Sequence, residues 1–131
     1  MATSTELKQS IAAGQYDATF EKLYAKDAAA VAAQRARYIH AIERFEHYFG
    51  TDRTVRLYSA PGRTEIGGNH TDHNHGRVLA GSVNLDVIAV AAYSAENRIR
   101  IQSKGYPMDV IDCGALGPVD EEANHSASLI R

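Results

Sequence analysis

The sequence predicts an α+β fold, in which N-terminal helices pack on a mixed or antiparallel sheet. Up to residue 50, apolar side chains recur at the three- and four-residue spacing of amphipathic helices. From residue 55 onward they fall into short runs and alternating stretches that are typical of strands. We therefore expect one domain over residues 1–131, with helices in 1–50, a sheet and a polar loop in 51–113, and the start of a further helix in 120–131.

Three helices are expected before residue 50. The first covers residues 5–13, and residues 16–25 form a short amphipathic helix. Asp27 is a good N-cap for a longer helix that ends near Phe49, and Gly50 suits the position after its end. The apolar face of this long helix consists of Val31, Tyr38, Ile42, Phe45 and Phe49. Polar side chains on its other faces are expected to meet water; they are Gln34, Arg37, His40, Arg44 and His47.

Strands are expected between residues 55 and 94. Residues 55–60 predict a strand that Pro61-Gly62 stops, and residues 77–83 and 85–94 are also strand-like. In the last of these segments the apolar residues alternate through Leu85, Val87, Ala89 and Ala91.

The C-terminal segments predict two further strands and a helix. Ala95-Glu96-Asn97 is expected to be a hairpin turn that leads into a strand with one wet face over residues 98–103. Residues 108–113 predict a last short strand, and Asp120 a cap for the closing helix.

Composition excludes several classes of protein. The net charge of −2 gives no electrostatic basis for binding nucleic acid or an anionic membrane. Cys113 is the one cysteine, so no internal disulfide can form. The first 30 residues lack a signal pattern, and the longest apolar run, residues 87–93, is too short to span a bilayer. We expect a soluble cytoplasmic protein without nucleic-acid or membrane partners.

The polar loop over residues 62–76 is the most informative segment. It carries four glycines, an arginine, two carboxylates, two carboxamides, three histidines and two threonines. A metal site is not expected, because neighbouring residues of an extended segment face opposite sides; the possible ligands are His70, Asp72, His73 and His75. A phosphate cradle is also disfavoured, since a strand pattern rather than a helix follows and no Walker lysine is present.

A sugar matches the loop better than an anion or a metal. Each sugar hydroxyl both donates and accepts hydrogen bonds, and Asn69, His70 and Asp72 supply a matching mixture of groups. Arg63 adds a permanent positive charge where negative charge could develop. The alternative from these residues alone is a solvated turn with local hydrogen bonds.

Residues 60–73 also resemble a known signature. Their sequence, Ala-Pro-Gly-Arg-Thr-Glu-Ile-Gly-Gly-Asn-His-Thr-Asp-His, aligns without a gap to the galactokinase pattern Ala-Pro-Gly-Arg-x-Asn-Leu-Ile-Gly-Glu-His-Thr-Asp-Tyr. Galactokinases belong to the GHMP small-molecule kinases. The resemblance extends over about residues 35–105. It implies that the chain is an incomplete N-terminal domain of such a kinase.

The resemblance implies a role for individual residues. Arg63 matches the arginine near the reacting phosphoryl group, where it stabilises the transition state. Asn69, His70 and Asp72 match the positions that hold galactose hydroxyls, and Thr71 lies within the same substrate-binding stretch. Ser103 falls near where family members approach the nucleotide, although a simple strand-end hydroxyl is the alternative reading.

Several positions depart from the family pattern. Glu65 stands where asparagine is usual, Gly67 where isoleucine is usual, and His73 where tyrosine is usual. Asn69 replaces the carboxylate that grips the sugar, and a carboxamide both donates and accepts where a carboxylate only accepts. The identity of the sugar therefore stays open between galactose and a related monosaccharide.

The resemblance also sets the expected activity. The complete enzyme of this type transfers the γ-phosphate of ATP to the anomeric hydroxyl of galactose, giving galactose 1-phosphate, with ATP and Mg²⁺ as cofactors. The 131 residues lack the family's Gly-Leu-x-Ser-Ser loop and its catalytic aspartate, so the fragment alone is expected to be inactive and to bind neither cofactor nor metal. A stand-alone sugar-binding or sensor module and a kinase for a different hexose are the alternatives. Self-association through an exposed core of a truncated domain is also expected.

Overall fold

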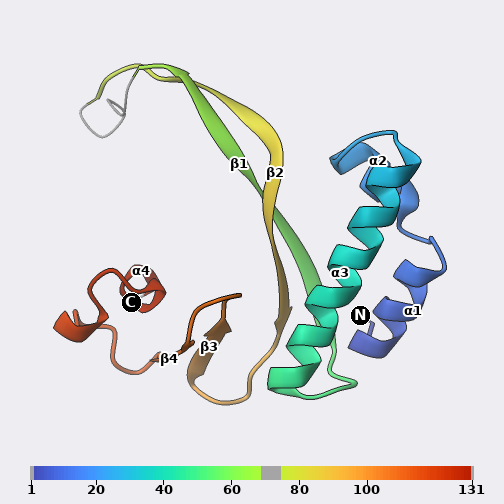
Figure 1. Cartoon of the computed structure of the whole chain (residues 1–131). Coiled ribbons are helices and arrows are strands. Elements are labelled where there is room, and N and C mark those ends of the chain that lie inside the picture. The colour runs from blue at the N-terminus through green and yellow to red at the C-terminus, as the bar shows by residue number, and fades with distance from the viewer. Residues whose placement is uncertain (1, 69–74, 131) are drawn as a thin grey trace. The chain divides into compact units, whose positions relative to one another are not determined.

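The computed structural model describes residues 2–68 and 75–130, which divide into two compact units, Met1–Ala92 and Tyr93–Arg131 (Figure 1). The first unit contains α1 (Ser4–Ala12), α2 (Asp17–Leu23), α3 (Ala28–Phe49), β1 (Val55–Gly67) and β2 (Leu79–Ala92). The second contains β3 (Arg98–Gln102), β4 (Met108–Asp112), the short 3-10 helix η2 (Asp120–Glu122) and α4 (Ser126–Ile130). Helices together with antiparallel strands confirm the α+β class. The assignment of residues 1–131 to one domain stays a prediction.

Side-chain caps fix the beginnings of α1 and α3. The Thr3 hydroxyl accepts a hydrogen bond from the Glu6 N–H at 3.2 Å, while a Glu6 carboxylate oxygen accepts from the Thr3 N–H at 2.8 Å. The Asp27 carboxylate accepts from the N–H groups of Ala29 and Ala30, which confirms Asp27 as the N-cap of α3.

The core of the first unit lies between the three helices and the base of the β1–β2 hairpin. Its buried members are Leu7, Ile11, Phe20, Val31, Tyr38, Ile42, Phe45 and Val55. The predicted apolar face of α3 is confirmed, with Phe49 partly buried at its end. On β2 the residues packed against this core are Ile88, Val90 and Ala92.

The structure determines which face of β2 is covered. The even-numbered side chains from Asp86 to Ala92 face the helices, so the alternating residues Leu85 and Val87 are each 74% exposed. Successive strand residues point to opposite faces, so a change of one position moves the whole set from the core to the solvent side. Both faces of this strand are apolar, and the alternation alone does not distinguish them.

The strands of the hairpin are longer than predicted. Strand β1 runs through Pro61 and Gly62 to Gly67, so the predicted stop at Pro61 is wrong, and β2 joins the two predicted segments 77–83 and 85–94 into one strand. The hairpin is a two-stranded sheet in which each strand has one free edge. A proline, which has no N–H to donate, is tolerated on such an edge and at a register shift, and one occurs directly after Pro61.

In the second unit β3 pairs with β4, in register from Arg98↔Asp112 to Gln102↔Met108. The two predicted strands are confirmed, but the predicted hairpin turn at 95–97 is wrong, because β2 pairs with β1 and not with β3. The closing helix is also broken, into η2 and α4. Asn124 between them has a positive φ of 66°, which interrupts a right-handed helix.

None of the helices in residues 2–68 and 75–130 combines the length and the apolar character that crossing a bilayer requires.

A buried acidic contact ties α1 to α3. The side chain of Glu46 is 8% exposed and accepts hydrogen bonds from Lys8 Nζ at 2.5 Å and from Ser4 Oγ at 2.6 Å. The hydrogen bond from Lys8, with that from Ser4, lowers the pKa of the Glu46 carboxyl below its usual 4.5. The contact therefore favours the ionised carboxylate of the folded protein.

We expect Glu46→Gln to lower the free energy of unfolding by about 1–2 kcal/mol at pH 7, since a charged hydrogen-bond acceptor is lost. A carboxyl with a lowered pKa stabilises the fold above its unfolded pKa and loses that effect as the pH falls through the folded pKa. The difference between wild type and Glu46→Gln should therefore shrink below about pH 4.5, as measured by urea denaturation. Glu43→Gln, an exposed change on the same helix, serves as control; an equal loss in both variants would contradict the role of Glu46.

Candidate functional site: the neck of the hairpin

The candidate site lies at the end of the hairpin that is remote from the helices. Strands β1 and β2 pair from Val55↔Ala92 at the base to Gly67↔Leu79 at the tip. Beyond Pro61 on β1 and Asp86 on β2, the strands have no buried residue and run on toward the loop (Figure 1). We call residues 62–68 and 79–85 the arm of the hairpin.

The arm begins at an irregularity in the pairing. Pro61 pairs with Asp86, and Arg63 pairs with Ser82, so one residue of β1 stands opposite three residues of β2. The single β1 residue is Gly62, and a Cβ atom there would lie 3.2 Å from the Leu85 carbonyl oxygen. The bulged backbone of β2 thus approaches Gly62 closely, and bulges of this kind bend a strand and increase its twist.

The arm ends in a narrow neck, where the backbone of Gly68 lies close to that of Arg77 and Val78. Gly68 has a φ of 110°, and a Cβ atom there would lie 2.4 Å from the Arg77 carbonyl oxygen and 2.6 Å from Val78 Cα. His75, on the other side of the neck, has a φ of 60°. Gly67 has open space around it and no positive φ. The backbone therefore requires glycine at position 68 but not at position 67.

Arg63 lies on β1 within the arm and is exposed. It lines a small hollow of about 50 Å³ together with Glu65, Val78 and Ala80. Small-molecule pockets typically measure roughly 300–1,000 Å³. The described residues of the arm therefore do not form a monosaccharide pocket by themselves.

The predicted sugar-binding residues Asn69, His70, Thr71 and Asp72 lie outside the residues that the structure describes. Their assignment stays a prediction, as does the disfavoured metal site, for which His75 is the one candidate ligand in the described part. Ser103 is exposed after β3 in the second unit, where its carbonyl oxygen accepts from the Tyr106 N–H at 3.2 Å. Its proposed role near the nucleotide also stays a prediction.

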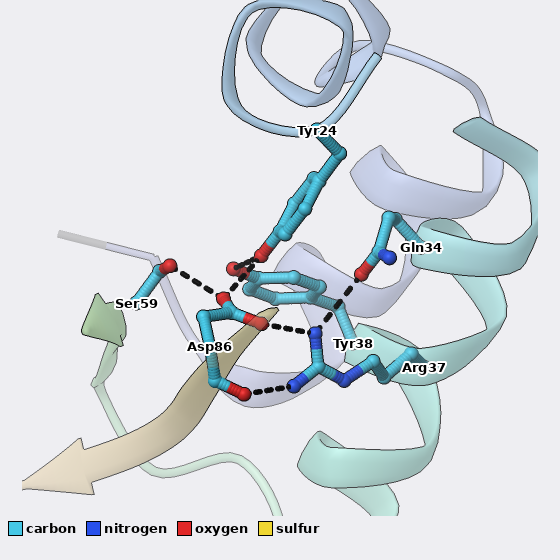
Figure 2. A network of polar contacts seen from close by, with 6 residues as sticks. All are labelled: Tyr24, Gln34, Arg37, Tyr38, Ser59 and Asp86. Atoms are coloured by element: carbon cyan, nitrogen blue, oxygen red, sulfur yellow. Dashed lines mark hydrogen bonds and ion pairs between the residues drawn. The ribbon is translucent and has the colours of Figure 1, made fainter. Parts of the chain in front are cut away.

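A polar network, absent from the sequence-based expectations, lies where the helices meet the hairpin (Figure 2). Its centre is Asp86, whose side chain is 4% exposed. Asp86 Oδ1 accepts from Arg37 Nη1 at 2.5 Å, and Oδ2 accepts from the hydroxyls of Tyr24 at 2.6 Å and Ser59 at 2.5 Å. Arg37 Nη2 also donates to the backbone carbonyl of Asp86 at 2.8 Å, and the hydroxyls of Tyr24 and Tyr38 share a hydrogen bond of 2.8 Å.

The charges of this network are mutually stabilised. Burial raises the pKa of Asp86, but the hydrogen bonds from Ser59, Tyr24 and Arg37 outweigh it and the net pKa is lowered. Burial likewise opposes the charge of Arg37, yet the hydrogen bond to Asp86 leaves the pKa of the guanidinium raised. Burial and the bond to Asp86 raise the pKa of Tyr24, which stays a neutral donor. The carboxylate is therefore ionised and fully paired at neutral pH.

The expectation that Arg37 meets water is only partly correct. Its side chain is 37% exposed, but the guanidinium lies against β2 and holds Asp86. The signal that could have found this pair is the acidic residue itself, which interrupts an apolar strand on its covered face. A buried carboxylate requires a charged or hydrogen-bonding partner, and Arg37 lies on the helix that covers that face.

The hairpin is also the part of the chain that a model of a known protein family matches. The family model described as "Galactokinase galactose-binding signature" matches residues 43–93. The predicted resemblance to galactokinases is confirmed. This galactokinase signature segment comprises the end of α3, both strands of the hairpin and the loop between them. Asp86 lies inside it, whereas Arg37 lies outside it.

Individual galactokinases are similar over the same part of the chain. The galactokinase of Lactococcus lactis subsp. cremoris (strain MG1363) is 31% identical over 65 residues, which are 50% of this chain and 16% of that protein. The galactokinase of Enterococcus faecalis (strain ATCC 700802 / V583) is 35% identical over 65 residues, with the same two shares of 50% and 16%. The galactokinase of Candida parapsilosis is 24% identical over 102 residues, which are 76% of this chain and 20% of that protein. The matches thus span a fifth or less of these relatives. No solved structure matches the chain.

Proposed function

We propose that the loop after Gly68 binds galactose or a related monosaccharide, and that the protein to which this hairpin belongs is an ATP-dependent sugar kinase. The observation that supports this proposal is the galactokinase signature segment, residues 43–93, which coincides with the hairpin and its loop. The reaction would transfer the γ-phosphate of ATP to the anomeric hydroxyl of the sugar.

The residues of the loop supply the chemistry that a sugar requires. Asp72 accepts hydrogen bonds from hydroxyl groups, and Asn69 and His70 can both donate and accept them. Arg63, near the start of the arm, brings a permanent positive charge and a planar set of donors. In this proposal it stabilises the negative charge that spreads over the phosphoryl oxygens during transfer.

Among the described residues, the N-termini of α1 and α3 do not offer a phosphate site. Helix N-termini bind phosphate through free N–H groups, but those of α1 and α3 are occupied by the side chains of Thr3 and Asp27. We therefore assign ATP and Mg²⁺ to no described residue, apart from the predicted proximity of Ser103.

Asn69 favours a second candidate, a kinase for a different hexose. The family pattern has a carboxylate at this position, and a carboxamide presents a donor to the hydroxyl that it meets. A sugar whose hydroxyl is reversed or replaced at that carbon would then be the better ligand. Titration of galactose against glucose, mannose and talose distinguishes the two candidates by the dissociation constant Kd.

The role of Asp72 is tested by calorimetry of the full-length natural protein. We expect Asp72→Ala to raise the galactose Kd by about 5- to 150-fold, because an unpaired polar group in a sugar site costs about 1–3 kcal/mol. Asp120→Ala, a change at an exposed aspartate in the second unit, should leave Kd within about twofold. An unchanged Kd in Asp72→Ala would argue against a sugar-binding loop.

A further inference from the structure

We infer that Arg37 and Asp86 form a clamp that sets the direction of the hairpin arm, and thereby positions Arg63 and the loop for the sugar. The clamp consists of Arg37, Asp86, Tyr24 and Ser59. The inference rests on the proposed function for its sugar-binding consequence, while the mechanical part concerns the described residues alone. Arg37 and Asp86 are positioning residues in this scheme, because neither lies on the loop.

The clamp is located at the root of the arm. Asp86 pairs with Pro61, the last pair before the bulge, and its side chain points to the same face as Ile88 and Val90 in the core. Toward the base of the hairpin, the helices cover the strands. Toward the tip, no residue of the arm is buried. The clamp therefore marks the last point at which the helices hold the hairpin.

The contacts join three other segments of the chain to this single carboxylate of β2. Tyr24 follows α2, Arg37 belongs to α3, Ser59 belongs to β1 and Asp86 belongs to β2 (Figure 2). The rings of Phe20, Tyr24 and Tyr38 pack together, with centroids 5.1–6.5 Å apart. The donors are thus held by aromatic packing, which limits how far the carboxylate can shift.

Arg37 holds the strand itself and not only a side chain. One nitrogen of its guanidinium binds Asp86 Oδ1, and the other binds the Asp86 backbone carbonyl at 2.8 Å. Gln34 Oε1 accepts from the first nitrogen at 3.2 Å, which fixes the plane of the guanidinium further. A planar fork that grips both main chain and side chain restrains the direction of a strand as well as its position.

The arm needs such a restraint because a two-stranded ribbon is marginally stable on its own. From Asp86 to Leu79, the arm extends over seven residues, or about 23 Å at about 3.3 Å per residue. A tilt of about 10° at the root would therefore displace the tip by about 4 Å. Catalytic groups lose about 100-fold in rate when they are misplaced by about 1 Å.

Apolar side chains could fill the space of Arg37 and Asp86, but they could not replace their directional hydrogen bonds. Buried ion pairs contribute little to stability compared with apolar residues of similar volume, so an apolar replacement is expected to fold. The double variant Arg37→Met with Asp86→Leu removes the directional contacts and leaves no unpaired charge. It separates a positioning role from a role in stability.

The first test measures the arm directly. In the 131-residue chain with Cys113→Ser, nitroxide labels are attached at Thr64→Cys on the arm and at His40→Cys on α3, and pulsed electron spin resonance gives the distance distribution between them. We expect the distribution to be at least twice as wide in Arg37→Met/Asp86→Leu as in the parent. Arg35→Ala is the matched control, since Arg35 on α3 pairs with Asp17 on α2 and, within residues 2–68 and 75–130, with no strand residue. Equal widths in the double variant and the parent would overturn the clamp.

The second test measures the sugar site. In the full-length natural protein, the double variant should raise the galactose Kd at least tenfold while its melting temperature stays within a few degrees of wild type. Arg35→Ala should leave Kd within twofold. Should the double variant fail to fold, Arg37→Lys replaces it, because lysine keeps the charge but cannot grip both oxygens; a widened distribution and a raised Kd are again expected.

Negative results in the two tests have different meanings. A widened arm with an unchanged galactose Kd would overturn the positioning role. If the unsubstituted protein bound neither galactose nor glucose, mannose or talose, the proposed function would be rejected, and the label distances would still establish or overturn the clamp.

Discussion

Replacing Arg63 by alanine in the full-length natural protein is expected to lower kcat for sugar phosphorylation by about 100- to 1,000-fold. Arg63 lies on the exposed arm of β1, two residues beyond Pro61 and outside the loop that we propose to hold the sugar. Its charge would be used when negative charge develops on the transferred phosphoryl group. The Kd of galactose, measured by calorimetry without ATP, should change by less than about threefold, because binding energy that appears only in the transition state affects kcat.

Two further variants make the test of Arg63 specific. Arg63→Lys keeps the charge but loses the planar fork, so an intermediate kcat is expected. Arg98→Ala removes an exposed arginine from β3 and should leave kcat unchanged within about twofold. A variant Arg63→Ala with wild-type kcat, or one whose loss lies wholly in the galactose Kd, would refute the assigned role.

Replacing Gly68 by alanine is expected to weaken galactose binding at least tenfold, and to lower the free energy of unfolding by about 1–3 kcal/mol. The backbone at Gly68 has a φ of 110°, which side-chain-bearing residues rarely adopt. A Cβ atom would also lie 2.4 Å from the Arg77 carbonyl oxygen, so the two sides of the neck would have to separate. Calorimetry with galactose and urea denaturation measure the two effects.

The adjacent glycine is the matched control for this change. A Cβ atom at Gly67 would meet nothing within 4 Å, and this is the position at which the galactokinase pattern carries isoleucine. Gly67→Ala should therefore preserve both the galactose Kd and the unfolding free energy within experimental error. Equal effects at the two positions would show that the neck does not depend on a close backbone approach.

Local signals in the sequence predicted the helices well. The cap at Asp27 and the apolar face of α3 depend on residues within a few positions of one another, and the structure confirms both. The galactokinase pattern was equally recoverable, because it is carried by consecutive residues on one hairpin.

Features that depend on contacts between distant segments could not be predicted from local sequence patterns. Both faces of β2 are apolar, so only the packing of α3 on Ile88 and Val90 determines that Leu85 and Val87 face outward. The pairing of β1 with β2 likewise carries the strand past Pro61, which local propensity marks as an end. The predictions failed where the outcome depends on a partner element distant in sequence.

The candidate site was predicted less well than the helices. Arg63, expected in the polar loop, lies on strand β1, and the four predicted sugar contacts from Asn69 to Asp72 remain predictions. The contact between Arg37 and Asp86 joins positions 49 residues apart, and no short motif announces it.

The separation of Arg37 from the signature segment has a consequence for anyone who transplants this recognition element. A graft of residues 43–93 onto a foreign scaffold would carry the hairpin, its bulge and its glycine neck, but it would leave the guanidinium that grips Asp86 behind. In the new scaffold, Asp86 would lack the positive charge that it pairs with here. The hairpin arm would also lack the contact that sets its direction. A graft that keeps the whole clamp therefore begins earlier, at Tyr24, so that it includes both Tyr24 and Arg37.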